Sequence, residues 1–143
     1  MPRFAIVPDH AVTIAVRVRY FETDKMQVAH HANYLVWFEE ARSAFCRIRG
    51  IDYPQMERDG LFLPIVEAHC RYIAPARYDE LLSVSVFVLE CARRSVRFGY
   101  VIQRDETLLA EGETYQILVD GNGRPRSWPE ELAARMTLGL PAT

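Results

Sequence analysis

Large apolar residues occupy every second position from Val12 to Tyr20, and Thr, Ala or Arg fills the positions between them. A period of two residues is typical of a β-strand that buries one face and exposes the other. We therefore predict that this segment is the first strand of the chain and that Tyr20 belongs to its buried face.

Beyond this strand the apolar residues recur at spacings of three or four. The positions with this spacing are Tyr34, Phe38, Ala41, Phe45 and Ile48. They predict a helix from Tyr34 to Arg49 with one apolar face, and Gly50 stands where a glycine commonly ends a helix. Leu35, Trp37 and Ala44 add apolar surface outside that face. We therefore expect other elements to wrap around the helix.

Four further segments are rich in β-branched and aromatic residues, which favour strands. They are Leu61–Tyr72, Leu81–Glu90, Ser95–Arg104 and Thr107–Asp120. The last two connections are short enough for hairpins, and Pro64 suggests that the first of the four lies at a sheet edge or contains a bulge. Ser127 and Glu130 have the spacing of a capping box that opens a short terminal helix. The chain should adopt an α+β fold, with an antiparallel sheet of about five strands and one long helix.

The composition indicates an ordinary globular protein. The 143 residues fit one domain spanning 1–143. Half of the residues are hydrophobic, and 17 basic against 19 acidic side chains leave a net charge near −2. This balance argues against a broad nucleic-acid-binding surface, and no segment reaches the roughly 18 consecutive apolar residues of a membrane span. We expect a soluble protein whose partner is a small molecule or another copy of the chain.

The cysteines and the first residues bear on localisation. Cys46, Cys70 and Cys91 stand far apart and form no CxxC pair. An odd number of widely spaced cysteines argues for reduced thiols. The N-terminal segment has no basic start followed by a long apolar core and a cleavage site. We therefore expect a cytoplasmic protein that is not exported.

Several motifs resemble those of one enzyme family. They are Tyr20–Met26 (YFETDKM), His31–Tyr34 (HANY), Trp37–Arg42 (WFEEAR), Tyr72–Leu81 (YIAPARYDEL), Arg93–Ser95 (RRS) and Gly123–Arg126 (GRPR). Together they resemble the hotdog-fold acyl-CoA thioesterases of the 4-hydroxybenzoyl-CoA thioesterase family, over about Thr13 to Ala134. The resemblance implies hydrolysis of an acyl-CoA thioester to a free acid and CoA. It also implies a sheet curled around the helix, and homodimers or tetramers of dimers with joined sheets and active sites at the subunit interface.

The resemblance also implies roles for particular residues. Asp24 holds the position of the catalytic carboxylate, which acts as a nucleophile or as a base toward water. The backbone N–H of His31, at the start of the helix, would hold the thioester carbonyl, and Tyr34 would line the acyl pocket. The residues that match phosphate-binding positions for CoA are Arg93, Arg94 and Ser95. Some hotdog thioesterases use a helix glutamate as catalyst, which makes Glu39 a second candidate.

One position departs from the family pattern. Many members carry glycine where this chain has Gln27. A side chain at that position either points away from the thioester or narrows the acyl pocket. His30, next to His31, places a second imidazole near the expected site without an assigned task.

The chemistry of thioester hydrolysis fits these groups. Negative charge develops on the carbonyl oxygen, and N–H donors at a helix N-terminus are suited to stabilise it. A carboxylate is a sufficient partner, because a thiol with a pKa of about 8.5 leaves as thiolate with little help from an acid. We therefore expect no metal or organic cofactor, and coenzyme A enters only as part of the substrate.

Three alternatives stay open. Hotdog folds also serve acyl-CoA hydratases and dehydratases, but those that use Asp and His place four residues between them, whereas five separate Asp24 from His30. The domain could bind acyl-CoA without hydrolysing it, although the intact Asp24 argues against this. The donor could also be an acyl carrier protein, with Arg93 and Arg94 meeting its acidic surface.

The identity of the acyl group is also open. The aliphatic and aromatic residues available for an acyl pocket are Tyr34, Leu61, Phe62 and Leu63. A short aliphatic, a branched or an aromatic acyl group would suit them equally.

Overall fold

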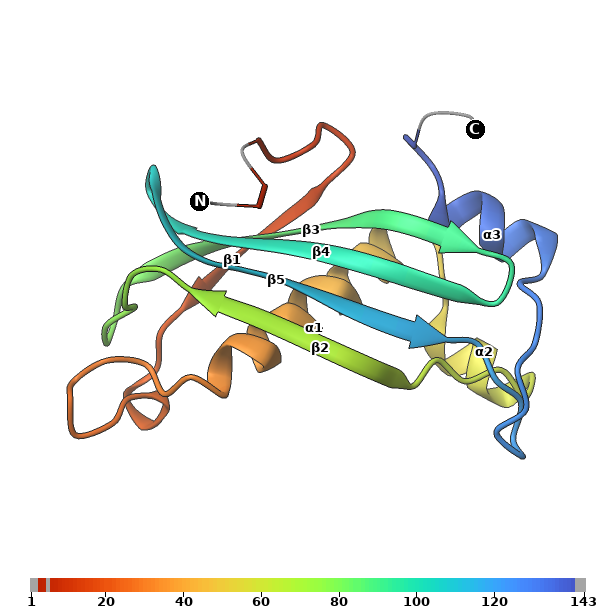
Figure 1. Cartoon of the computed structure of the whole chain (residues 1–143), viewed down its shortest axis with the longest axis horizontal. Coiled ribbons are helices and arrows are strands. Elements are labelled where there is room, and N and C mark those ends of the chain that lie inside the picture. The colour runs from red at the N-terminus through yellow and green to blue at the C-terminus, as the bar shows by residue number, and fades with distance from the viewer. Residues whose placement is uncertain (1–2, 5, 141–143) are drawn as a thin grey trace.

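The computed structural model describes residues 3–4 and 6–140, so the outermost residues of the expected domain 1–143 lie outside the described part. Its five strands form one antiparallel sheet in the order β1-β3-β4-β5-β2. The elements are β1 (Val12–Arg17), the 3-10 turn η1 (Tyr20–Glu22), α1 (Asn33–Ile48), α2 (Tyr53–Arg58), β2 (Ile65–Tyr72), β3 (Leu81–Ala92), β4 (Ser95–Arg104), β5 (Thr107–Ile117) and α3 (Glu130–Met136). Figure 1 shows α1 lying along one face of the sheet. The expected α+β hotdog fold is confirmed.

Aromatic side chains hold α1 against the sheet. Trp37, Phe38 and Phe45 are almost completely buried. Phe38 stacks on Tyr100 of β4 with ring centroids 4.3 Å apart, and Phe45 meets Phe98 edge-on at 5.4 Å. Burying each phenylalanine side chain stabilises the fold by roughly 1.5–3 kcal/mol. The predicted helix is therefore the centre of the core.

The helix ends at the predicted glycine. Gly50 has a φ of 72°, its N–H donates to the Arg47 carbonyl, and the Ile51 N–H donates to the Cys46 carbonyl at 2.8 Å. This pair of bonds is a Schellman motif, which folds the residue after the glycine back against the last helical turn. Ile51 is accordingly buried, whereas Ile48, which we expected on the buried face, is 67% exposed. The turn thus replaces Ile48 with Ile51 in the core.

The first strand is shorter than predicted. β1 ends at Arg17, and Tyr20 opens η1 with 77% of its surface exposed, so its predicted place on the buried face is wrong. The Glu22 N–H donates a hydrogen bond to the Arg19 carbonyl, three residues earlier, at 3.0 Å. Since a 3-10 turn has a period of three residues, the two-residue alternation stops here.

The second predicted strand begins late. Leu61 and Leu63 are buried in an irregular segment, and β2 starts only after Pro64, at an edge of the sheet as predicted. The short helix α2 was not predicted. Its N-terminus is capped by Asp52, whose side chain accepts the Gln55 N–H at 3.1 Å.

The terminal helix is present, but its predicted capping box is wrong. α3 follows Pro129, and its N-cap makes no side-chain hydrogen bond. The Ser127 hydroxyl instead accepts a hydrogen bond from Arg93 Nε at 3.1 Å. No helix in the described part of the chain is long and apolar enough to cross a membrane.

The two ends of the sheet carry different segments. Arg17 of β1 pairs with Leu81, so the chain between β1 and α1 lies at the end where β3 begins. The β3–β4 turn lies at the other end of β3, twelve residues away, or about 35–40 Å at the usual rise of a strand. Figure 1 shows the orange segment before α1 at the left and the β3–β4 turn at the right.

Candidate active site

Asp24 lies in a tight loop between η1 and α1. The loop closes by a bridge between Thr23 and Ala29, and within it the Asp24 N–H donates to the Val28 carbonyl at 3.0 Å. One carboxylate oxygen, Oδ1, accepts the Met26 N–H at 2.8 Å. The other oxygen makes no hydrogen bond or ion pair with the described residues. One oxygen therefore fixes the side chain, and the other is available for chemistry.

The conformation of this loop suits a glycine at position 27. Gln27 has a φ of 65°, in the left-handed region that glycine adopts without penalty, and its N–H donates to the Asp24 carbonyl at 2.9 Å. Non-glycine residues pay roughly 1–2 kcal/mol for this conformation. The backbone, and not only the space for substrate, thus favours glycine here.

His31 lies exposed, two residues before α1. Its N–H finds no acceptor within residues 3–4 and 6–140, while its carbonyl accepts a hydrogen bond from the Tyr72 hydroxyl at 2.8 Å. The neighbouring His30 uses Nδ1 to accept the Ala32 N–H at 3.3 Å, and the two imidazole rings lie 4.2 Å apart. The His31 N–H is therefore an unengaged donor at the start of a helix, where the dipole favours negative charge.

Tyr34 belongs to the core beneath the site. It is buried, and its hydroxyl accepts the Ala76 N–H at 3.3 Å. The Ala76 carbonyl in turn accepts the Ala29 N–H at 2.8 Å. Burial raises the pKa of Tyr34, so the phenol stays neutral. Through Ala76, the Tyr34 hydroxyl thus connects α1 to the end of the Asp24 loop.

Glu22 connects the two segments of the candidate site, and the sequence assigned it no task. Its side chain is 1% exposed, and its carboxylate accepts the Arg19 N–H at 2.7 Å and Trp37 Nε1–H at 3.1 Å. Burial alone would raise the pKa of Glu22, but the hydrogen bonds from Arg19 and Trp37 outweigh it and hold the pKa below its ordinary value. The Glu22 carbonyl accepts the His30 N–H at 2.8 Å. This bond joins the segment before Asp24 to the segment before His31.

The phosphate-binding candidates lie at the far end of the sheet. Arg93 and Arg94 are exposed in the β3–β4 turn, and Ser95 is buried with its carbonyl accepting Trp128 Nε1–H at 3.1 Å. Within the described residues the Arg94 guanidinium makes no hydrogen bond or ion pair. One chain therefore brings Asp24 and the His31 N–H together but not the arginine turn.

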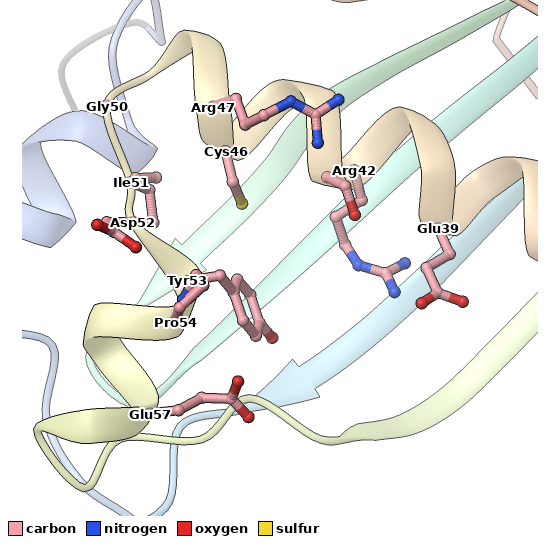
Figure 2. Close-up of a pocket in the computed structure, with 11 residues that line it drawn as sticks. Glu39, Arg42, Cys46, Arg47, Gly50, Ile51, Asp52, Tyr53, Pro54 and Glu57 are labelled. Carbon is pink, nitrogen blue, oxygen red and sulfur yellow. The ribbon is translucent and has the colours of Figure 1, made fainter.

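A separate groove of about 670 Å³ runs between α1 and α2. Figure 2 shows Glu39 and Arg42 of α1 and Tyr53 and Glu57 of α2 beside it. Arg42 Nη1 donates to the Tyr100 hydroxyl at 2.9 Å, and burial raises the pKa of Tyr53 to about 12. Of the predicted site residues only Glu39 lines this groove.

The structure also bears on metal binding. Across the described residues, His, Cys, Asp and Glu side chains do not gather in groups of three or more that could hold a metal ion.

The sequence and the fold are similar to those of known proteins. A profile of the thioesterase-like superfamily matches residues 16–136. A putative esterase from Aquifex aeolicus is 34% identical over 116 residues, which cover 81% of this chain and 90% of that protein. The putative acyl-CoA thioesterase YneP from Bacillus subtilis is 36% identical over 93 residues, or 65% of this chain and 67% of that protein. The solved structure of the hypothetical protein TT1821 from Thermus thermophilus has a TM-score of 0.84 and 36% identity, covering 88% of this chain and 97% of that one.

Proposed function

Because the chain belongs to the thioesterase-like superfamily, we propose that it hydrolyses acyl-CoA thioesters to a free acid and CoA. The observation that carries the proposal is the unengaged His31 N–H at the start of α1, joined to the Asp24 loop by the bond from His30 N–H to the Glu22 carbonyl. The Bacillus relative is named as a putative acyl-CoA thioesterase, which supports the same substrate class.

The proposed reaction uses a carboxylate and an N–H donor. The His31 N–H donates a hydrogen bond to the thioester carbonyl oxygen while negative charge develops on that oxygen. Asp24 either removes a proton from the attacking water or attacks the carbonyl carbon itself through its available oxygen. In both routes the C–S bond breaks and CoA leaves as a thiolate. When water attacks, this step releases the free acid; when Asp24 attacks, it leaves an anhydride between the acyl group and Asp24, which water then cleaves to the free acid and the restored carboxylate. The reaction as proposed uses no metal or organic cofactor.

A second chain completes this site in our proposal. β2 is an edge strand with exposed apolar residues, among them Val66 at 49% exposure, and such edges are normally paired or covered. A two-fold axis that pairs two β2 edges antiparallel turns the second sheet end for end. The Arg93–Ser95 turn of one chain then lies at the Asp24 end of the other. A homodimer, alone or as half of a tetramer, therefore offers guanidinium groups for the CoA phosphates.

The cysteines support a cytoplasmic location in this proposal. Cys46, Cys70 and Cys91 are all free thiols, and burial raises the pKa of Cys46 to about 11. Free thiols persist in a reducing compartment.

The test of the activity is the substitution Asp24→Asn. Asparagine keeps an oxygen for the Met26 N–H, so the loop should stay intact, but it can act neither as a base nor as a nucleophile. We expect kcat for acyl-CoA substrates, read as released thiol, to fall by roughly 10³-fold. A panel of acyl groups ranks substrates in the same assay.

Two control variants accompany this test. Asp105→Asn changes an exposed aspartate in the β4–β5 turn and should leave kcat unchanged. Glu39→Gln tests the second catalytic candidate and should also retain activity. An Asp24→Asn protein with wild-type kcat, or a wild-type protein that binds acyl-CoA without releasing thiol, would refute the proposed function.

A further inference from the structure

The peptide group between His30 and His31 is held by one side chain. The His30 carbonyl accepts two hydrogen bonds, from the Asn33 N–H at 3.0 Å and from Asn33 Nδ2 at 3.2 Å. A trans peptide is planar, with its C=O and N–H pointing in opposite directions. Fixing the His30 oxygen therefore fixes the direction of the His31 N–H, which points away from Asn33.

The Asn33 carboxamide makes a second contact that ties this peptide to the Asp24 loop. Nδ2 also donates to the Glu22 carbonyl at 2.9 Å. Both partners are carbonyl oxygens, which accept but do not donate, so only the NH₂ end of the carboxamide fits there. Glu22 is itself fixed by its buried carboxylate. The Asn33 carboxamide thus bridges Glu22, two residues before Asp24, and the peptide group that carries the His31 N–H.

The next peptide is held independently from the sheet. The His31 carbonyl accepts the Tyr72 hydroxyl at 2.8 Å and the Tyr34 N–H at 3.3 Å. The Tyr72 ring packs edge-on against Tyr34, with centroids 4.9 Å apart. Both peptide groups of His31 are therefore fixed, and the N–H is the one polar backbone group of this residue without a partner in the described part of the chain.

We propose that Asn33 is a positioning residue, whose carboxamide aims and polarises the His31 N–H for the developing oxyanion. This inference rests on the proposed thioesterase function. Donation to a carbonyl strengthens the N–H of the same peptide as a donor, because hydrogen bonds in a chain polarise one another. A donor held in place before the reaction begins is also the kind that stabilises a transition state most. The arrangement supplies both effects without a side chain touching the substrate.

The test compares Asn33→Ala with wild type. Alanine is a strong helix former, so the start of α1 should persist, but both donations from the side chain are lost. We expect kcat to fall about tenfold or more, with KM for the acyl-CoA changed less than about threefold, because the bond strengthens mainly in the transition state. Asn122→Ala removes the carboxamide of an exposed turn residue and should leave kcat unchanged.

A spectroscopic readout separates positioning from a purely structural role. In an Asp24→Asn background, a bound acyl-CoA labelled with ¹³C at the carbonyl should show its C=O stretch shifted to lower frequency than in water. Adding Asn33→Ala should move the band back toward the aqueous value. If Asn33→Ala does not fold, Asn33→Ser serves, because its hydroxyl can donate to only one carbonyl and should keep only part of the shift.

The outcomes distinguish this inference from the proposed function. Wild-type kcat in Asn33→Ala, or an unchanged C=O band, would overturn the role of Asn33 while Asp24→Asn remains inactive. A wild-type protein that releases no thiol from any acyl-CoA would overturn the proposed function first. A loss of unfolding free energy with kcat unchanged would assign Asn33 to structure alone and also overturn the inference.

Discussion

The charge of the Glu22 carboxylate links the stability of the fold to the geometry of the candidate site. It is buried, yet its hydrogen bonds with Arg19 and Trp37 favour the ionised form over the protonated one. Its backbone carbonyl receives the His30 N–H and the Asn33 carboxamide. The ionisation of this one group therefore affects both stability and the geometry before α1.

The lowered pKa of Glu22 predicts how stability depends on pH. Because the folded-state pKa lies below the unfolded value of about 4.3, the contribution of Glu22 is fully present above that pH. It is lost as the pH falls through the folded-state pKa. Glu22→Gln should reduce the unfolding free energy by roughly 1–3 kcal/mol at pH 7, and this difference from wild type should shrink below about pH 4.

Urea unfolding of both proteins across this pH range checks the prediction. Glu57→Gln changes an exposed glutamate of α2 and should show no such difference at any pH. A Glu22→Gln difference that stays constant down to pH 3 would mean that the charge is not what stabilises the loop.

The left-handed conformation of Gln27 predicts that glycine is tolerated better at this position. Gln27→Gly relieves roughly 1–2 kcal/mol of backbone strain but adds about 0.5–1 kcal/mol of chain entropy to the unfolded state. The variant should be equally stable or up to about 1 kcal/mol more stable. Asp105→Gly, at a φ of 53° in the β4–β5 turn, is the matched control for strain. Thermal unfolding measures both, and a clear loss of stability in Gln27→Gly would contradict the strain argument.

At the scale of single residues, some site residues could be predicted from the sequence and others could not. Asp24 and His31 were reached through the motif in which they stand. Glu22 and Asn33 stand in the same two motifs, but their task depends on which groups they bind, and that is set by the path of the loop. Tyr72 comes from another strand, so only the folded chain shows that its hydroxyl reaches the His31 carbonyl.

At the scale of elements, one glycine sets how closely α1 approaches the sheet. A Cβ on Gly112 of β5 would lie 2.5 Å from Phe38 Cε2 and would also press on the His69 carbonyl of β2. Real Cβ atoms do not come this close, so α1 or β2 would have to move. The absence of a side chain at Gly112 is therefore what lets Phe38 pack against the sheet.

Gly112→Ala should accordingly destabilise the fold by roughly 1–3 kcal/mol, the usual cost of overpacking a core. Urea unfolding provides the measurement. Gly121→Ala is the control, because a Cβ there meets only Phe62 at an ordinary 3.9 Å, and its unfolding free energy should change little. Equal stabilities of the two variants would show that α1 shifts without cost.

The elements could be predicted where a hydrophobic pattern extends over many residues. Prediction failed where a few residues determine the local structure. The long helix and the five strands follow from patterns of nine or more residues. α2 has six residues, which is too short for a periodic signal, and depends on the Asp52 cap. The predicted capping box at Ser127 does not form, because Arg93, which is remote in sequence, donates a hydrogen bond to the Ser127 hydroxyl.

At the scale of the whole molecule, the separation of the two halves of the site is the main consequence of the fold. The Asp24 loop follows β1 at one end of the sheet, and the Arg93–Ser95 turn follows β3 at the other. No sequence pattern fixes this distance, because it depends on the length and direction of β3. In the proposed dimer, each site takes its carboxylate from one chain and its guanidinium groups from the other.

This arrangement predicts complementation between two defective chains. One chain carries Asp24→Asn, and the other carries Arg93→Ala with Arg94→Ala. In a mixed dimer one of the two sites then combines the intact Asp24 of the second chain with the intact arginines of the first. Random pairing makes half of the dimers mixed, so about a quarter of wild-type activity should appear at low acyl-CoA concentration. Coexpression of the two chains with different tags, followed by purification and a thiol-release assay, provides the measurement.

Each variant alone is the control, since Asp24→Asn should be inactive and the arginine variant should show a raised KM for acyl-CoA but not for an acyl-cysteamine. If the mixture is no more active than the arginine variant at half its concentration, or if sedimentation gives a monomer, each site draws on a single chain and the proposed dimer is wrong.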